Sequence, residues 1–413
     1  MWERIQGSGG THRWHGWGGA GSVVASMSKE VRLGIIGVGN IGRHHAGYLL
    51  EGRVRRARLT ALCSVVPQEL EPYKNRGLAL HEDAGALLKS GEVDAVVIAT
   101  PHYQHVTIGI AALEAGLHIM VEKPIAAHKA DAERLIGAAA ARPGQVFGAM
   151  FQLRVEPRYL KLRQLLRNGD LGRILRLTWI NTDWFRTDAY YSSSGWRATW
   201  KGEGGGVLIN QCLHNLDTLQ WLMGMPAKVR GFCQLGRHRR IEVEDTVTAY
   251  LEWADGATGT FVSTTAEAPG TNRLEIAGTR GRLVLENERM TFDRNEVDAE
   301  EFNRTSTSGF AKPDTWRIEI PFGNATLGHA QLMQGFVDAI LDGRDPVVRG
   351  EEGMQSIELA NAILFSSLED RTVGLPLDGA AYEARLESLI AGSRFEKQVR
   401  QSSADDFEKS FRR

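Results

Sequence analysis

The stretch Arg-Leu-Gly-Ile-Ile-Gly-Val-Gly-Asn-Ile-Gly, residues 32–42, decides the fold of the N-terminal part of the chain. An apolar strand pattern runs directly into a Gly-x-Gly-x-x-Gly motif, and a helical pattern follows. The first glycine permits a tight turn, the second lets the backbone approach a pyrophosphate, and the third lets helix and strand pack closely. The N-terminus of the helix adds unpaired N–H donors and positive dipole charge. The prediction is a dinucleotide site that includes Gly37, Gly39, Asn40, Ile41 and Gly42.

Around this motif, short apolar runs typical of buried strands alternate with helical patterns as far as about Met150. Such alternation is typical of a parallel sheet with helices on both faces. We therefore expect a doubly wound α/β domain, a Rossmann domain, over residues 29–150. Strands are expected at 32–36, 58–63, 94–99, 117–121 and 145–149, with a poorer one near Leu78, and a helix at 102–115.

The pattern changes after residue 150. Helices are expected at 157–168 and 207–223, each followed by a glycine that can end it, and a late helix at 351–369. From Lys228 to Glu286 apolar and polar residues alternate as they do in strands, without helical patterns between them. Successive strands of this kind predict a mainly antiparallel sheet, so residues 151–385 are expected to form a second, α+β domain.

Both ends of the chain are expected to lie outside these two domains. Residues 1–28 carry seven glycines and three tryptophans, but no charged region followed by a long apolar stretch. We expect them to form a disordered leader. Residues 386–413 are expected to form a charged, frayed tail.

Composition restricts the class of ligand. The chain has 413 residues, with 42% hydrophobic and 24% charged, which is typical of compact globular proteins. Its formal charge of -1 gives no global field for a polyanion, so a small molecule is expected rather than nucleic acid. No apolar run is long enough to predict a membrane span. The three cysteines form no CxxC pair, which favours a reducing, cytoplasmic location and argues against a disulfide framework or a metal site.

The choice between NAD and NADP stays open in the sequence. A site selective for NAD usually carries Asp or Glu at the end of the second strand, where it binds the ribose 2′-hydroxyl. Here that position is Ser64, which can donate to a hydroxyl or to a 2′-phosphate and repels neither. The neighbouring Val65 and Val66 offer no cation for the extra phosphate. The predicted cofactor is therefore NAD or NADP.

Two further segments show a resemblance to a known family: residues 99–124, ending in Glu122-Lys123-Pro124, and residues 204–224, GGGVLINQCLHNLDTLQWLMG. With them the chain resembles the Gfo/Idh/MocA oxidoreductases, from Val31 to about Leu377. The resemblance implies a large open sheet in the second domain, used for homodimers or homotetramers. It also implies that Lys123 lies beside the nicotinamide and the reacting hydroxyl, where a cation can stabilise an alkoxide. Further cofactor-binding residues implied in this way are Thr100, Pro101, His105, Glu122 and Arg154.

The family pattern places the acid/base histidine at His214, a residue type whose pKa suits proton transfer near neutrality. Asn210, His214 and Asp217 are spaced so that, on one helix, all three would project from the same face. Where the family usually has aspartate, this chain has Asn210, a neutral amide that cannot stabilise an imidazolium as a carboxylate would. We therefore expect Lys123 and His214 to share the proton transfer, while Asn210 and Asp217 bind substrate.

The segment from Trp179 to Trp200 is dense in aromatic and hydrogen-bonding side chains. Aromatic faces can cover the C–H side of a sugar ring while polar groups bind its hydroxyls. The alternative is a strand and loop that bury tryptophans in the core, and Trp179 is expected to be such a structural residue. The other substrate-binding candidates are Arg186, Tyr190, Tyr191, Trp196 and Arg197.

The prediction is an NAD(P)-dependent oxidoreductase that transfers a hydride between nicotinamide and a ring carbon of a sugar, glycoside or cyclitol. One alternative is a glycoside hydrolase that oxidises the sugar transiently and regenerates its NAD in each turnover. A non-catalytic nucleotide-binding sensor is the third possibility. It is less favoured because Lys123 and His214 are both present.

Overall fold

The computed structural model describes residues 30–324 and 328–400. Its N-terminal part is built on a six-stranded parallel sheet in the order β3-β2-β1-β4-β5-β6, which is the order of a doubly wound dinucleotide-binding fold. The predicted strands are confirmed to within two residues at each end: β1 (Val31–Ile36), β2 (Ala57–Cys63), β3 (Ala79–His81), β4 (Ala95–Ile98), β5 (His118–Val121) and β6 (Phe147–Ala149).

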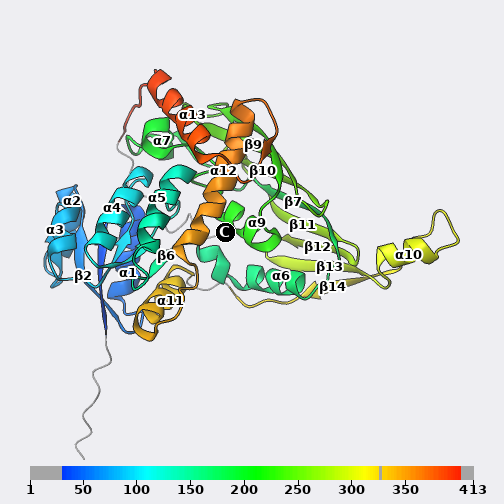
Figure 1. The fold of residues 1–413 in the computed structure, drawn as a ribbon, viewed down its shortest axis with the longest axis horizontal. Coiled ribbons are helices and arrows are strands. Elements are labelled where there is room, and N and C mark those ends of the chain that lie inside the picture. Colours follow the sequence, from blue (N-terminus) through cyan, green and yellow to red (C-terminus); the bar gives the residue numbers. More distant parts are fainter. Residues whose placement is uncertain (1–29, 325–327, 401–413) are drawn as a thin grey trace, which may run out of the picture.

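Helices cover both faces of this sheet (Figure 1), so a central strand such as β4 is buried along its whole length. This explains its unbroken apolar run, because a parallel sheet exposes neither face to water. The helices that follow the strands are α1 (Asn40–Leu50), α2 (Pro67–Leu70), η1 (Glu71–Tyr73), α3 (Ala84–Lys89), α4 (His102–Glu114) and α5 (Lys129–Ala140).

The second part is built on a nine-stranded sheet in the order β14-β13-β12-β11-β7-β10-β9-β8-β15. Neighbouring strands are antiparallel except β7 and β10, which are parallel, so the predicted mainly antiparallel sheet is confirmed. Its strands are β7 (Ile174–Asn181), β8 (Lys228–Leu235), β9 (Glu244–Glu252), β10 (Thr258–Thr264), β11 (Asn272–Gly278), β12 (Gly281–Glu286), β13 (Arg289–Asn295), β14 (Thr315–Ile320) and β15 (Val373–Gly374).

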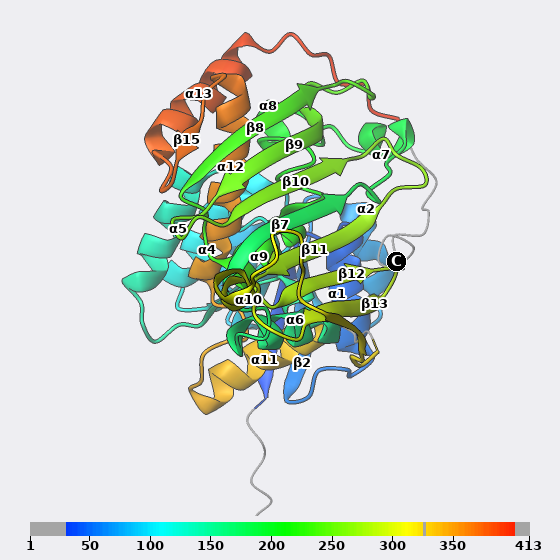
Figure 2. The same cartoon turned by 90° about the vertical axis from the view of Figure 1, so that its right-hand side faces the viewer.

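One face of this sheet packs on helices, and Figure 2 looks onto its other, open face. Trp179 of β7 is fully buried on the packed side, as expected of a structural tryptophan. The remaining helices are η2 (Gln152–Val155), α6 (Pro157–Arg167), α7 (Asp188–Ser192), α8 (Trp200–Glu203), α9 (Leu213–Met223), α10 (Ala299–Thr305), α11 (Gly328–Asp342), η3 (Gly350–Glu352), α12 (Gly353–Leu368) and α13 (Gly379–Gly392).

The two sheets are joined by α12, which packs against β8 and α9 on one side and α5 on the other (Figure 1). In addition, α11 returns to the first part of the chain and packs on α1, where Arg56 forms an ion pair with Asp342 at 2.6 Å. Within the described residues, no helix combines the length and apolar composition needed to cross a membrane.

Two predicted boundaries are wrong. The helix expected at 207–223 begins only at Leu213, because residues 204–212 form a turn. The tail expected from residue 386 begins inside α13, whose Tyr382 and Leu386 are buried in the core. The expected leader at 1–28 and the last part of the tail lie outside the described residues.

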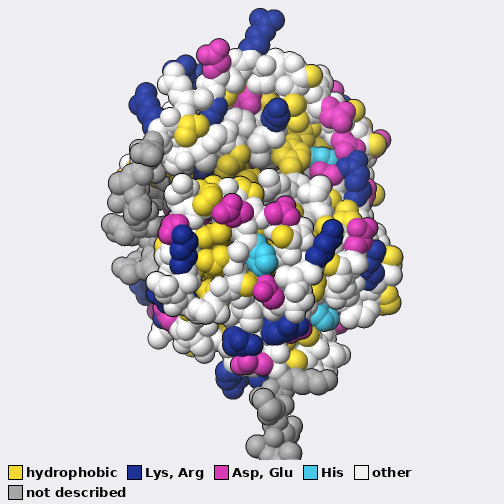
Figure 3. All heavy atoms as spheres, turned by 90° about the vertical axis from the view of Figure 1, so that its left-hand side faces the viewer, with side chains coloured by type: hydrophobic (Ala, Val, Ile, Leu, Met, Phe, Trp, Pro, Cys, Tyr) yellow, Lys and Arg dark blue, Asp and Glu magenta, His cyan; other side chains and the backbone are white. Residues whose placement is uncertain are grey.

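Figure 3 shows the face of the molecule on the side of the six-stranded sheet. Acidic and basic side chains are interspersed over this face, and hydrophobic side chains gather in a hollow near its middle. The described part of this face therefore has mixed charge, unlike the basic surfaces that bind nucleic acid.

Candidate active site

The glycines of the motif form a cradle between β1 and α1. Gly37 has φ of 95°, and a Cβ there would lie 2.6 Å from the Ala99 carbonyl oxygen. A Cβ on Gly42 would lie 1.9 Å from the carbonyl oxygen of Gly37, so helix and strand can meet only at a glycine. A Cβ on Gly39 would meet no atom within 4 Å, which leaves open space directly before the N-terminus of α1 at Asn40. A pyrophosphate fits this space.

Thr100 and Pro101 follow β4, beside the glycine cradle, and Pro101 precedes the first turn of α4. The Thr100 hydroxyl is buried and has no hydrogen-bond partner in the described part of the chain. A buried hydroxyl without a partner is unfavourable, so this oxygen suits a polar group of a bound molecule. The cradle and this hydroxyl together fit a dinucleotide.

A carboxylate lies at the end of β2, where the sequence showed none. The Ser64 hydroxyl donates to Glu69 Oε2 at 2.6 Å, which brings the Glu69 carboxylate to the strand end that reads the ribose in such folds. Arg43 lies 4.0 Å from the other oxygen of Glu69. Ser64 therefore holds an acid in place instead of facing the cofactor alone.

Lys123 follows β5 and reaches across to the second part of the chain. Its Nζ donates to the main-chain carbonyl of Asn210 at 2.8 Å. Burial lowers the pKa of the Lys123 ammonium to about 8, although Glu122 and Glu203 oppose the shift. Such an amine can change its protonation state near physiological pH.

The Lys123 backbone is supported by a buried carboxylate. Glu122 accepts hydrogen bonds from the Lys123 N–H at 3.1 Å and from His45 Nε2 at 2.6 Å. Burial acts to raise the pKa of Glu122, but the His45 hydrogen bond brings it below its ordinary value. His45 in turn contacts the Tyr48 hydroxyl at 2.5 Å. Glu122 is thus an anion buried beneath Lys123.

His214 is the second residue of α9 and is buried except for 7% of its surface. Its ring meets Phe151 edge-on, with centroids 5.8 Å apart. Phe151 follows β6, and β6 is the neighbour of β5 in the sheet. Lys123 and the ring that contacts His214 therefore lie beyond adjacent strand ends, on the edge where open α/β sheets bind ligands.

The turn before α9 separates Asn210 from His214 and Asp217, so these residues do not share a helix face as predicted. Buried Glu244 of β9 holds this turn, because its Oε1 accepts from Gly206 N at 2.8 Å and from Leu208 N at 3.1 Å. Burial raises the pKa of Glu244 to about 7. The turn presents the Asn210 carbonyl to Lys123.

Arg154 was expected to bind the cofactor and Asp217 the substrate. In the structure, the two side chains form an ion pair with each other instead. The Arg154 guanidinium donates to both oxygens of Asp217, at 2.7 and 2.6 Å, and also pairs with Glu352. The Asp217 carboxylate is fully buried and Arg154 is 3% exposed, so neither side chain faces an open site. Their ion pair fixes α9, and with it His214, against η2 and η3.

The aromatic segment contributes four of its five predicted residues to the region near Lys123. Tyr190 Oη accepts from Arg197 at 2.8 Å, and it lies 3.4 Å from the Asn210 side-chain amide. Trp196 lies against His102 of α4, with ring centroids 5.5 Å apart. Arg186 joins them through the Tyr190 ring, 5.2 Å away.

Tyr191 points the other way. It is buried, and its hydroxyl donates to Thr265 Oγ1 at 2.9 Å, so its assignment to substrate is wrong.

His105 also has a different role from the predicted binding of the cofactor. Its two ring nitrogens lie 2.6 Å from the carbonyl oxygens of Pro124 and Thr100, so the ring ties two turns together and leaves no nitrogen for a cofactor.

Three acidic residues near the site were missed: Glu69, Glu203 and Glu244. Glu203 is buried, and it accepts hydrogen bonds from Ala198 N at 2.5 Å and from the Asn210 amide. Burial raises the pKa of Glu203, against the influence of Arg197. The only signal in the sequence was the position of Glu203 directly before three glycines, since its partners come together only in the fold.

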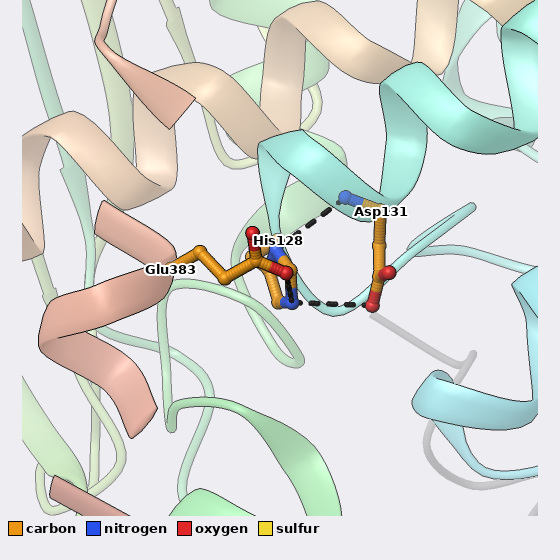
Figure 4. A group of neighbouring side chains, drawn as sticks. All are labelled: His128, Asp131 and Glu383. Carbon is orange, nitrogen blue, oxygen red and sulfur yellow. Dashed lines mark hydrogen bonds and ion pairs between the residues drawn. The ribbon is translucent and has the colours of Figure 1, made fainter. Parts of the chain in front are cut away.

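One group of His and carboxylate side chains in the described residues has the spacing of a metal site: His128, Asp131 and Glu383 (Figure 4). His128 Nε2 lies 3.1 Å from Asp131 and 3.8 Å from Glu383. Arg134 binds both of these carboxylates, Glu383 at 2.6 Å. Because a guanidinium already balances their charge, we read the group as an ion-pair network that fastens α13 to α5.

Comparisons with known proteins give matches to both parts of the chain. Residues 31–149 match the family model described as an oxidoreductase family with an NAD-binding Rossmann fold, and residues 159–284 match the Gfo/Idh/MocA C-terminal domain. The chain is 25% identical to myo-inositol 2-dehydrogenase of Thermotoga maritima, over 84% of this chain and 98% of the relative. It is 28% identical to levoglucosan dehydrogenase of Pseudarthrobacter phenanthrenivorans, over 71% and 83%.

A similar solved structure is the WlbA dehydrogenase of Bordetella pertussis in complex with NADH and UDP-GlcNAcA, with 28% identity and a TM-score of 0.71. The match covers 84% of this chain and all of the WlbA chain. Both family models fall on the parts of the molecule that hold the glycine cradle, Lys123 and His214. The chain therefore belongs to the Gfo/Idh/MocA family of oxidoreductases, with an NAD-binding Rossmann domain followed by the family's C-terminal domain.

Proposed function

We propose that this protein is an NAD-dependent dehydrogenase that interconverts a ring hydroxyl and the corresponding ketone of a sugar, glycoside or cyclitol. The observation that carries the proposal is the position of Lys123. Its amine, with a pKa of about 8, follows β5 at the cofactor-binding edge and is held at 2.8 Å by a carbonyl of the second domain. The relatives named for inositol and levoglucosan support the class of substrate.

Each residue of the site has its own role in this reaction. NAD, held by the glycine cradle and Thr100, would supply the acceptor for the hydride of the alcohol carbon. The Lys123 ammonium donates a hydrogen bond to the alcohol oxygen and stabilises its negative charge as the C–H bond breaks. His214 takes the hydroxyl proton, and Asn210 and Trp196 orient the ring. The Arg154–Asp217 ion pair keeps α9 in position for this transfer.

We further propose that the cofactor is NAD and not NADP. The Glu69 carboxylate, held by Ser64 at 2.6 Å, would hydrogen-bond a ribose hydroxyl and repel a 2′-phosphate. The three cysteines are free thiols, which supports a reducing, cytoplasmic location.

The open face of the nine-stranded sheet is the proposed surface for a homodimer or homotetramer. Phe232 of β8 and Tyr250 of β9 are 57% and 45% exposed there, on adjacent strands. Light scattering during gel filtration tests this assembly. A wild-type mass above one chain, reduced by Phe232→Glu, is the expected result, whereas a monomeric wild type would contradict it.

The function is tested by incubating the protein and NAD+ with sugars, cyclitols and nitrophenyl glycosides. A dehydrogenase forms NADH in step with sugar oxidation. Release of nitrophenol without net NADH would instead identify the hydrolase that uses transient oxidation. Binding of NADH without turnover of any member of the panel would contradict both reactions.

A further inference from the structure

Two arginines meet at one aromatic ring close to Lys123. The Arg186 and Arg197 guanidinium carbons lie 5.2 and 4.7 Å from the centre of the Tyr190 ring. Arg186 also lies 5.5 Å from the Trp184 ring, and Arg197 lies 4.6 Å from the Trp196 ring. Both side chains are partly exposed, so aromatic faces hold the two cations while leaving them accessible.

This pair is connected to the proposed reaction site by a short chain of contacts. Arg197 donates to Tyr190 Oη at 2.8 Å, Tyr190 Oη lies 3.4 Å from the Asn210 amide, and the Asn210 carbonyl accepts from Lys123 at 2.8 Å. Apart from burial, the positive charges of Arg197 and Arg186 themselves act to lower the pKa of Lys123. The three cations therefore share one site.

No carboxylate among the described residues forms a direct ion pair with either arginine. Within the described residues, neither Arg186 nor Arg197 has a carboxylate oxygen within 4.0 Å, whereas many other arginines of the chain do. The acids nearby form their hydrogen bonds with other groups: Glu203 with Ala198 N and Asn210, and Glu242 with Trp200 N at 2.9 Å. Arg197 lowers the pKa of Glu203 only through space, without an ion-pair contact. The Lys397 ammonium, which donates to the Arg197 carbonyl at 2.8 Å, adds a further positive charge.

We propose that the substrate is an anionic carbohydrate, whose carboxylate or phosphate group is bound by Arg186 and Arg197 while its reacting hydroxyl lies at Lys123. This inference rests on the proposed function and narrows it. A guanidinium offers a planar fork of N–H donors that matches both anions, and Tyr190 and Trp196 supply aromatic surface for the ring. A neutral sugar would leave both guanidinium groups without a direct ion-pair partner.

The test compares neutral sugars with their anionic counterparts: methyl glucoside, methyl glucuronide and glucoside 6-phosphate, with equivalent sets for other hexoses. NADH formation gives kcat/KM for each. We expect kcat/KM of one anionic class to exceed that of its neutral parent at least ~10-fold, because hydrogen bonds to charged groups are stronger than neutral ones. The preference should weaken as salt rises. Preference for the uronide or for the phosphate tells which anion is bound.

Arg186→Gln should reduce the ratio of anionic to neutral kcat/KM by ~10-fold, and Arg186→Lys should retain part of it. The matched control is Arg167→Gln, an exposed arginine at the end of α6, which should leave the ratio unchanged. Equal or greater kcat/KM for neutral sugars would overturn the inference while leaving the dehydrogenase intact. So would an anion preference that persists in Arg186→Gln.

If no sugar is oxidised, the proposed function fails and the inference is decided by binding. Thermal shift measurements with NADH and the same compounds then apply. Stabilisation by an anionic sugar, lost in Arg186→Gln but not in Arg167→Gln, supports the anion site. The absence of any shift with anionic sugars would overturn it.

Discussion

Lys123 shows how the fold tunes a single residue. Its backbone is fixed by the buried Glu122 anion, its amine is fixed by the Asn210 carbonyl, and burial brings its pKa to about 8. The ordinary pKa of a lysine is far above the physiological range, so this amine can lose its proton under mild conditions. The Glu-Lys-Pro motif located the residue, but its surroundings come from the second domain.

We predict a pH dependence from this shift. If the ammonium stabilises the alkoxide, kcat/KM for sugar oxidation should fall as the pH rises through about 8, because Lys123 then loses its proton. Lys123→Met should lower turnover by ~100-fold or more, and its kcat/KM should no longer fall as the pH rises through this alkaline range. It should not melt earlier than wild type, because burying an ammonium is unfavourable. Lys74→Met, at an exposed ion pair, is the control; the same alkaline limb in Lys123→Met would contradict the assignment.

A second prediction at this scale concerns Glu69. Glu69→Gln removes the charge that would repel a 2′-phosphate and leaves Arg43 nearby, so the ratio of NADP to NAD efficiency should rise by ~10-fold. Steady-state kinetics with both cofactors measures the ratio. Glu71→Gln, at the exposed pair with Lys74, should leave it unchanged. An unaltered ratio in Glu69→Gln would mean that this carboxylate does not face the ribose.

At the scale of elements, the turn at residues 204–212 is where sequence reasoning failed. The spacing of Asn210, His214 and Asp217 fits a helix, yet Glu244, distant in sequence, binds the backbone N–H groups of the turn. A Cβ at Gly206 would lie 2.0 Å from the Glu244 carbonyl oxygen, so strand and turn meet closely there. No local pattern carries this information. The strands of the first sheet and the helices expected at 102–115, 157–168 and 351–369, in contrast, follow from local periodicity and glycine positions, and their ends were predicted to within two residues.

Glu244 should make stability depend on pH. Its folded pKa, raised to about 7, means that the folded protein binds more protons than the unfolded chain between about 4.5 and 7, so stability falls as the pH rises through this range. Glu244→Gln keeps an acceptor without the charge and should be more stable above pH 7 by about 1–3 kcal/mol. Glu244→Ala should lower both stability and turnover. Urea unfolding at several pH values measures these free energies. If the difference in unfolding free energy between Glu244→Gln and wild type did not change with pH, the raised pKa of Glu244 would be contradicted.

At the scale of the whole molecule, segments from both domains and from the C-terminal region meet at the same place. Lys397 donates to the Arg197 carbonyl, and Arg400 N donates to the Ser192 carbonyl at 2.9 Å. Residues 393–400 thus lie along α7 and the loop that carries Trp196. The composition of this region predicted only a frayed tail, because contacts between such distant segments depend on the completed fold.

Removal of residues 393–413 should therefore raise KM for the sugar by ~10-fold, since the loop that carries Arg197 loses its support. NADH affinity should stay the same, because the glycine cradle lies on a separate part of the molecule. Kinetics and fluorescence titration measure the two quantities. The Lys397→Met variant of the full-length chain is the control for the truncation. If the truncated protein lost NADH affinity together with sugar affinity, an effect confined to the Arg197 loop would be contradicted.

Lys123 and His214, from different domains, are proposed to act on one hydroxyl beside the cofactor. The decisive experiment is single-turnover hydride transfer, measured together with NADH affinity in wild type, Lys123→Met and His214→Gln. We expect each variant to transfer hydride ~100-fold or more slowly, while its NADH dissociation constant stays within about threefold of wild type. Undiminished transfer in either variant, or affinity that falls in proportion to rate, would contradict the account.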